Sequence, residues 1–144
     1  MHRIKNYKLL MVGTGELEEA VKKAIELHHL EDAVQLMRKI PNSDIWELYR
    51  MADVFVNLNR QEIFGMAILE AMYYSCKVVA CHAPGPDFII DSGRTGFLVN
   101  RNDEIVDTIL KGNICAEDAH ESIVNKFTWD SMASKIIKLL EENE

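Results

Sequence analysis

Short apolar runs alternate with longer amphipathic stretches along this 144-residue chain, and that alternation restricts the folds open to it. The runs cover residues 8–12, 33–37, 53–58, 77–81 and 97–99, and each is followed by glycine or polar residues. Uniformly apolar runs of this length are typical of parallel strands that are buried on both faces. The sequence therefore predicts an α/β fold with an open, Rossmann-like parallel sheet and flanking helices.

Helical periodicity separates these runs. In residues 16–30, apolar side chains recur three or four positions apart, with glutamate and lysine between them. Similar patterns predict helices ending near residue 51 and over residues 65–74, 105–110, 116–125 and 130–142, with a turn at 83–86 and one helical turn at 88–90. In the last helix, we expect Met132, Ile136, Leu139 and Leu140 to form the inner face.

Composition limits the classes of protein to consider. Apolar residues make up 48% of the chain and charged residues 27%, which predicts one globular domain over residues 1–144. Sixteen Lys and Arg against 23 Asp and Glu give a net charge of −7, which argues against general binding of nucleic acid or anionic membranes.

Location and redox state follow from two further features. No apolar run reaches about 18 residues, and residues 1–6 are too short and polar for a signal peptide. The chain has three cysteines, Cys76, Cys81 and Cys115, and none of them forms a C-x-x-C motif. Because their number is odd, they cannot all form disulfides within the chain. We therefore expect a cytoplasmic protein with reduced thiols.

The segment from Glu62 to Met72 carries the sharpest chemical signal. Its two carboxylates, Glu62 and Glu70, stand eight positions apart, and every residue between them is apolar or glycine. Glu70 thus lies on a helix that is hydrophobic all round, so we expect it to be largely enclosed and in need of partners. Those partners are either Arg60 or a backbone donor, or else the adjacent hydroxyls of a ligand such as a ribose.

Phe64 and Gly65 precede the same helix. Glycine at a helix start lets a ligand approach the backbone closely, although it also simply permits a turn. The free N–H groups of a first helical turn favour a diphosphate. Because ligands of open parallel sheets bind beyond the carboxyl ends of the strands, the loops at 13–15, 38–41, 59–65 and 82–87 are the candidate binding loops.

Two other patterns are weak. Gly13-x-Gly15 follows the first strand, but Glu18 stands where a dinucleotide fingerprint has its third glycine, so a tight turn beside another ligand is favoured over NAD or FAD binding. The histidines have no metal-ligand spacing, and no metal site is predicted. His82 follows the fourth strand, near the expected cleft.

Several motifs together resemble a known family. These are Glu62-x7-Glu70 in the setting Glu-x-Phe-Gly-x4-Glu-Ala-Met, the strand Val78-Val79-Ala80, and the turn and strand from Gly93 to Val99. They resemble the C-terminal domain of retaining glycosyltransferases of the GT-B fold, family 4 (glycosyl transferases group 1). Residues 10–15, 48–56 and 127–129 resemble the family's "VGDG", "LYAAADVFV" and "FSW" segments, so the likeness covers about residues 7–142.

The resemblance implies a role for each site residue. The family transfers a sugar from a nucleotide-sugar donor to an acceptor hydroxyl with retention and without a metal, and its C-terminal domain binds the donor. Glu70 would hold the ribose hydroxyls, and Glu62, the implied catalytic residue, would lie against the donor sugar. Backbone groups at Phe64, Gly65 and Met66 would contact the sugar and phosphates, and Gly13 and Gly15 would lie beside the ligand, with Lys39 and Ile40 bordering the base.

The resemblance also implies what surrounds the domain. The donor would be UDP- or GDP-linked, no further cofactor is expected, and glucose, galactose, mannose and N-acetylglucosamine donors all remain open. The acceptor, a sugar or lipid-linked sugar in polysaccharide or glycolipid biosynthesis, would bind an N-terminal domain that this chain lacks. The full enzyme would be cytoplasmic or peripheral to the membrane, and the isolated chain inactive. The alternatives are a non-catalytic nucleotide-binding or assembly module of the same fold, and an unrelated α/β nucleotide-binding domain.

Departures from the family pattern add one expectation about the sheet. Ser75 and Lys77 stand near the family's Gly and Pro, and Asp87-Phe88 replaces its Pro-Glu. The family's first strand, whose following loop carries the Arg and Lys that neutralise the diphosphate, lies upstream of the segment matching Tyr7. By analogy that strand is central, so we expect the strands at 8–12 and 54–58 either to pair directly or to be joined by another chain through self-association at the exposed edges.

Overall fold

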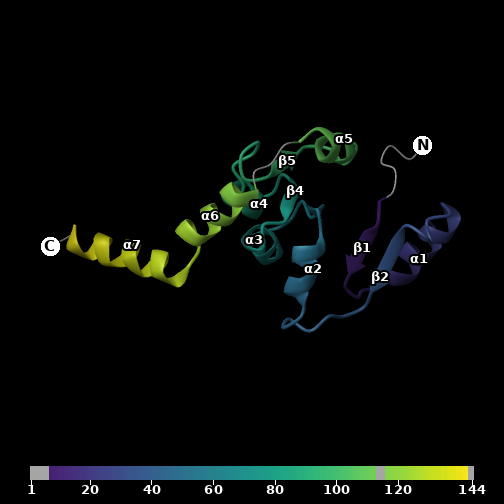
Figure 1. The fold of residues 1–144 in the computed structure, drawn as a ribbon, viewed down its shortest axis with the longest axis horizontal. Helices are drawn as coiled ribbons and strands as arrows, with labels where there is room; N and C mark the ends of the chain where they lie inside the picture. The colour runs from purple at the N-terminus through teal and green to yellow at the C-terminus, as the bar shows by residue number, and fades with distance from the viewer. Residues whose placement is uncertain (1–6, 113–115, 143–144) are drawn as a thin grey trace. The chain divides into compact units, whose positions relative to one another are not determined.

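The computed structural model describes residues 7–112 and 116–142, and these form two compact units, residues 1–45 and residues 46–144 (Figure 1). Each unit is described by itself. The α/β fold with parallel strands and flanking helices is confirmed. The prediction that residues 1–144 form one domain stays a prediction.

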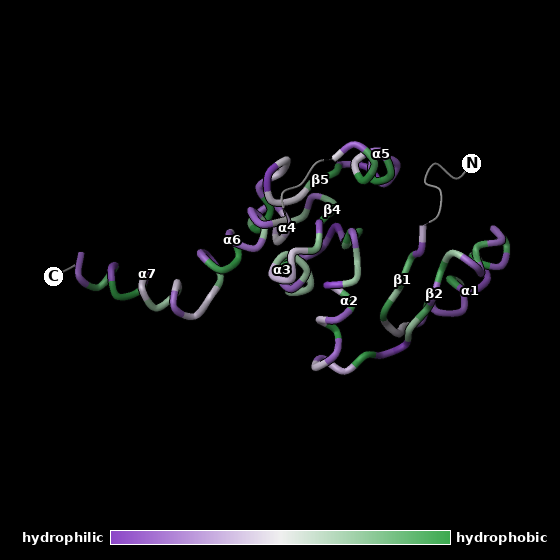
Figure 2. Tube along the Cα trace, in the orientation of Figure 1, coloured by the Kyte–Doolittle hydropathy of each residue, from purple (hydrophilic) through white to green (hydrophobic). Residues whose placement is uncertain are grey.

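The first unit is a single β–α–β crossover. It consists of β1 (Leu9–Val12), α1 (Glu18–Leu27) and β2 (Val34–Met37). The two strands pair in parallel, with Leu9 opposite Val34 and Val12 opposite Met37. No described residue from 7 to 45 is buried, and the apolar side chains of β1 are 38–45% exposed. Figure 2, which is coloured by hydropathy, shows β1 as a largely hydrophobic strand.

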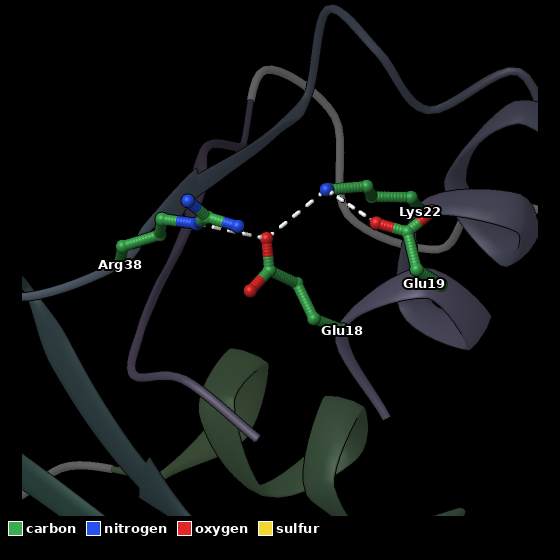
Figure 3. A network of polar contacts seen from close by, with 4 residues as sticks. All are labelled: Glu18, Glu19, Lys22 and Arg38. Atoms are coloured by element: carbon green, nitrogen blue, oxygen red, sulfur yellow. Dashed lines mark hydrogen bonds and ion pairs between the residues drawn. The ribbon is translucent and has the colours of Figure 1, made fainter. Parts of the chain in front are cut away.

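A charged network connects the start of α1 with the end of β2 (Figure 3). Glu18 on α1 lies 3.1 Å from the Arg38 guanidinium and 3.0 Å from the Lys22 ammonium, which also contacts Glu19. The hydrogen bonds from Lys22 and Arg38 hold the pKa of Glu18 below its usual value. Arg38, in a candidate binding loop, is therefore engaged within its own unit.

The second unit has a three-stranded parallel sheet in the order β3–β4–β5. Its elements are α2 (Ile45–Met51), β3 (Val54–Asn57), α3 (Met66–Tyr73), β4 (Lys77–Cys81), α4 (Pro84–Ile89), β5 (Phe97–Val99), α5 (Glu104–Lys111), α6 (Ala116–Lys126) and α7 (Trp129–Glu141). The register places Val54 opposite Lys77 and Val79 opposite Phe97.

The core of this unit lies around β4. On one face, Val79 and Cys81 pack with Val99 and with Ile105 of α5. Val78 and Ala80 point to the other face of the sheet and are also buried. Helix α3 packs against β3 and β4 and buries Ile68, Leu69, Ala71 and Met72. Helices cover this sheet, so four of the five residues of its central strand β4 are buried, while the residues of β3 are half-buried.

Two expectations about local structure are corrected. The segment predicted as a turn at 83–86 opens helix α4, because proline fits the first helical position, where its missing N–H has no partner to lose. The predicted inner face of the last helix is exposed: Met132, Ile136, Leu139 and Leu140 are 51–66% accessible. The apolar stripe forms an amphipathic helix, but α7 buries no residue of its own.

The structure gives each of the strands expected at 8–12 and 54–58 a partner within its own unit, and direct pairing between the two stays a prediction. Among the described residues, β1 pairs only with β2, β3 pairs only with β4, and the two strands belong to separate sheets. Along one edge, each strand pairs with the other strand of its own crossover, β1–α1–β2 or β3–α3–β4. The crossover does not determine which strand pairs with the opposite edge. A strand supplied by another chain stays a prediction.

No helix within the described residues combines the length and the apolar character needed to cross a membrane.

Candidate functional site

The loop after β3 is held by its own asparagine side chains. The backbone N–H of Asn59 donates to Oδ1 of Asn57 at 2.8 Å, and the N–H of Gln61 donates to Oδ1 of Asn59 at 3.0 Å. Nδ2 of Asn59 in turn donates to Oε2 of Glu62 at 3.2 Å. These short-range bonds are typical of asparagine in turns, and they fix the half-buried Glu62 beyond the carboxyl end of the sheet.

Helix α3 begins immediately after Gly65. Gly65 has φ of +96°, which favours glycine, and a Cβ there would lie 3.1 Å from Cδ1 of Ile68. No side chain within the described part of the chain caps this helix start. Phe64 and Met66, on either side of Gly65, are 47% and 59% exposed. The first turn therefore presents free backbone N–H groups beside accessible side chains.

Glu70 lies one turn further along α3 and is half-buried. Its Oε2 accepts a hydrogen bond of 3.0 Å from the hydroxyl of Tyr49 on α2. The expected alternative partner, Arg60, is engaged elsewhere, since its Nη2 donates to Oδ1 of Asn102 at 3.0 Å. Glu70 thus has a neutral donor as its partner, and among the described residues it forms no ion pair with a Lys, Arg or His side chain.

The Tyr49 hydroxyl is itself held in place by packing. Its ring stacks on Tyr74, with planes 9° apart, and meets Phe55 edge-on at 5.8 Å between ring centres. Tyr49 is 7% exposed, and burial, together with the hydrogen bond to Glu70, raises the pKa of its phenol. Tyr49 therefore stays protonated and can donate to Glu70 at ordinary pH.

Helix α4 is docked on the loop that carries Glu62. The backbone N–H of Gly85 donates to the carbonyl oxygen of Glu62 at 2.9 Å. A Cβ on Gly85 would lie 2.3 Å from the carbonyl oxygen of Phe64, which is closer than atoms can approach. Only glycine at this position permits the contact between α4 and the loop.

A histidine and an aspartate flank this contact. Nδ1 of His82, which follows β4, lies 2.7 Å from Oδ1 of Asp87 on α4. Sequence analysis placed His82 near the cleft but did not identify its partner. The signal was present as a histidine five positions before an aspartate, separated from it by the Pro-Gly-Pro segment that opens α4.

The structure brings together part of the predicted site. Glu62, Phe64, Gly65, Met66 and Glu70 follow one another from the carboxyl end of β3 into α3. Gly13, Gly15, Lys39 and Ile40 belong to the other compact unit, where they follow β1 and β2. There Gly13 donates its N–H to the carbonyl of Met37 at 2.9 Å, and Lys39 and Ile40 line an open concavity with Pro41 and Asn42.

The site of the second unit suits a ligand that has both hydroxyl groups and an anionic group such as a phosphate. Carboxylates accept hydrogen bonds from hydroxyl groups, and an uncapped helix start binds phosphate. Within the described residues, no group of three or more His, Cys, Asp or Glu side chains is arranged to hold a metal ion.

Solved structures confirm the fold. A structure of Alr3699/HepE from Anabaena in complex with UDP-glucose superposes with a TM-score of 0.81 at 23% identity, covering 96% of this chain and 42% of that one. The C-terminal domain of a glycosyl transferase group 1 family protein (LpcC) from Francisella tularensis gives a TM-score of 0.74 at 21% identity, covering 88% of this chain and 73% of that domain. The fold is that of GT-B glycosyltransferases.

Curated relatives are also similar in sequence. A probable sucrose-phosphate synthase from Thermosipho melanesiensis is 30% identical over 93 residues, which are 62% of this chain and 22% of that protein. An N-acetyl-alpha-D-glucosaminyl L-malate synthase from Bacillus anthracis is 29% identical over 138 residues, which are 89% of this chain and 35% of that protein. The chain therefore spans about a fifth to a third of these two relatives.

The family model described as "Glycosyl transferases group 1" matches residues 1–121, most of the chain and all of the Glu62–Glu70 segment. This protein belongs to the glycosyl transferases group 1 family.

Proposed function

We propose that this chain binds the donor, a UDP- or GDP-linked sugar, for a retaining and metal-independent transfer of a hexose to an acceptor hydroxyl. The proposal is supported by family membership and by HepE, a structural neighbour that was solved with UDP-glucose. The observation that carries it is the state of Glu70, a half-buried carboxylate beside an accessible helix start.

Glu70 would hold the two ribose hydroxyls. Tyr49 occupies its Oε2, and among the described residues Oε1 has no hydrogen-bond partner. A carboxylate that keeps its charge accepts strong hydrogen bonds, each worth about 1.5–3 kcal/mol. The neutral Tyr49 hydroxyl orients the carboxylate and leaves its charge available to the ligand.

The start of α3 would bind the diphosphate, through backbone N–H groups around Phe64, Gly65 and Met66. Glu62 would lie against the donor sugar as the catalytic residue. The proposal also includes four residues of the first unit. Gly13 and Gly15 would lie beside the ligand, and Lys39 and Ile40 would border the base.

In the complete enzyme, the bond between the anomeric carbon and the phosphate oxygen would break, with its electron pair passing to the diphosphate. The acceptor oxygen would attack the oxocarbenium-like carbon from the face that the diphosphate leaves, which retains the configuration. The positive end of α3 would stabilise the departing diphosphate without a metal ion. The acceptor would be bound by a separate domain, so we expect the isolated chain to be inactive.

Calorimetry with UDP, 2′-deoxy-UDP, GDP and 2′-deoxy-GDP tests the role of Glu70. The wild-type chain should bind one nucleotide at least about tenfold more tightly than its deoxy form, as one lost hydrogen bond to a charged group implies. Glu70→Gln should bind both forms equally weakly while keeping the wild-type circular dichroism spectrum. Glu47→Gln, on an exposed position of α2, is the matched control and should behave as wild type.

Two results would contradict the proposal. A folded wild-type chain that binds no nucleotide at millimolar concentration would favour a non-catalytic assembly module. Loss of folding in both Glu70→Gln and Glu70→Ala would assign Glu70 to the Tyr49 contact alone.

A further inference from the structure

We propose that His82, held by Asp87, hydrogen-bonds a hydroxyl group of the donor sugar and helps to determine which sugar the site accepts. This inference rests on the proposed function, because it places the sugar beside the Glu62 loop.

The backbone fixes the position of His82. Its N–H donates to the carbonyl oxygen of Val99 at 3.2 Å, which continues the pairing of β4 and β5 by one residue. His82 therefore sits at the carboxyl edge of the sheet, where the loop carrying Glu62 also begins. Ligands of parallel sheets bind at this edge.

Asp87 determines which nitrogen of the neutral imidazole carries the hydrogen. An ionised carboxylate only accepts hydrogen bonds, so at 2.7 Å Nδ1 of His82 must carry the hydrogen. In the neutral imidazole Nε2 is then an acceptor, and among the described residues it has no hydrogen-bond partner. The side chains of His82 and Asp87 are 42% and 49% exposed, so a ligand can reach them.

The pair is rigidly connected to the loop that carries Glu62. Gly85, which lies between His82 and Asp87, donates to the carbonyl of Glu62 and touches the backbone of Phe64. Further along α4, Cδ1 of Ile89 would lie 3.5 Å from a Cβ on Gly65. Because α4 contacts the loop at Gly85 and at Ile89, Asp87, which lies between them, and its partner His82 are held next to the loop that carries Glu62.

The local charge favours a sugar hydroxyl over a phosphate. Glu62 and Asp87 are both acids, and the guanidinium of Arg60 is directed to Asn102. A phosphate group in contact with these carboxylate oxygens would be repelled, unlike one that contacts the backbone N–H groups of α3. Acceptor atoms from a histidine and a glutamate instead suit hydroxyl groups, which donate to them. A surface pair such as His82–Asp87 contributes little to stability, so the fold does not require it.

The test compares each nucleotide with its sugar conjugate, using the chain of residues 1–144. Calorimetry would measure UDP against UDP-glucose and UDP-N-acetylglucosamine, and GDP against GDP-mannose, for wild type, His82→Ala and Asp87→Asn. His28→Gln, at the exposed end of α1, is the matched control. For one of these sugars, we expect the ratio of the affinity for the sugar nucleotide to that for the bare nucleotide to fall about three- to tenfold in His82→Ala. The ratio should fall less in Asp87→Asn. Affinity for the bare nucleotide should change less than twofold.

A second measurement does not depend on mutation. The imidazole nitrogen signals of His82 in NMR spectra should shift on adding the sugar nucleotide and stay in place on adding the bare nucleotide. A silent imidazole, or an unchanged affinity ratio in His82→Ala, would overturn the inference while leaving nucleotide binding intact. Equal weakening of nucleotide and sugar nucleotide would also overturn it, by assigning His82 to the phosphates or to folding. Absence of nucleotide binding in wild type would overturn the proposed function itself.

Discussion

Strands β1 and β4 have similar apolar sequences and opposite surroundings. All four residues of β1 are exposed, whereas four of the five residues of β4 are buried. In the second unit, α3 and α5 pack on the sheet, while α1 buries none of its residues. An apolar run therefore predicts a strand, but its burial depends on helices that cover it and on strands at both of its edges.

A matched pair of methionine substitutions would test this difference most strongly. Met72 on α3 is fully buried, and Met11 on β1 is 40% exposed. Met72→Ala should lower the free energy of unfolding by about 2–5 kcal/mol, because it leaves a cavity in the core. Met11→Ala should cost less than about 1 kcal/mol. Denaturant unfolding would measure both, and equal costs would mean that β1 is covered in solution, as by an added strand.

A pair of glycine substitutions should give the next largest effect. Gly85→Ala places a Cβ 2.3 Å from the carbonyl oxygen of Phe64, whereas nothing lies within 4 Å of a Cβ on Gly15. We expect Gly85→Ala to destabilise the fold by about 1–3 kcal/mol and to weaken nucleotide binding by displacing the Glu62 loop. Gly15→Ala, where the added methyl group meets no atom within 4 Å, should leave the free energy of unfolding unchanged within error. A silent Gly85→Ala in both thermal unfolding and calorimetry would show that the α4 contact is adjustable.

The buried thiol of Cys76 in the second unit predicts a smaller, pH-dependent effect on stability. Burial raises the pKa of Cys76 to about 11, and its Sγ donates to the carbonyl of Ala52 at 3.5 Å. The folded state therefore holds a proton that the unfolded chain has already lost, so stability must fall as the pH rises from about 9 to 11. The loss should be on the order of 2 kcal/mol.

In Cys76→Ala, a plot of the free energy of unfolding against pH should be less steep above about pH 9, because the contribution of the thiol is removed. Tyr49, whose pKa is also raised by burial, would leave part of the slope, and Tyr49→Phe in the same background should remove it. An unchanged slope in the double variant would mean that neither group is buried in solution.

Much of this architecture was predictable because it depends on local patterns. Apolar runs and helical periodicity gave each strand to within a few residues, and the Glu62–Glu70 spacing placed Glu62 before α3 and Glu70 one turn inside it. The family assignment rests on the same segment and is confirmed. The proline-rich segment at 83–86 was misread because a helix start and a turn share the same residues.

The sequence by itself determined the α/β class, the family and the acidic, glycine-marked segment that would bind the donor, since each is written in neighbouring residues. Only the tertiary structure decided that Tyr49 rather than Arg60 holds Glu70, that Asp87 holds His82, and that the strands form two sheets. The reason is physical. A hydrogen bond between side chains depends on how separate elements pack, and packing depends on surfaces that no single segment contains.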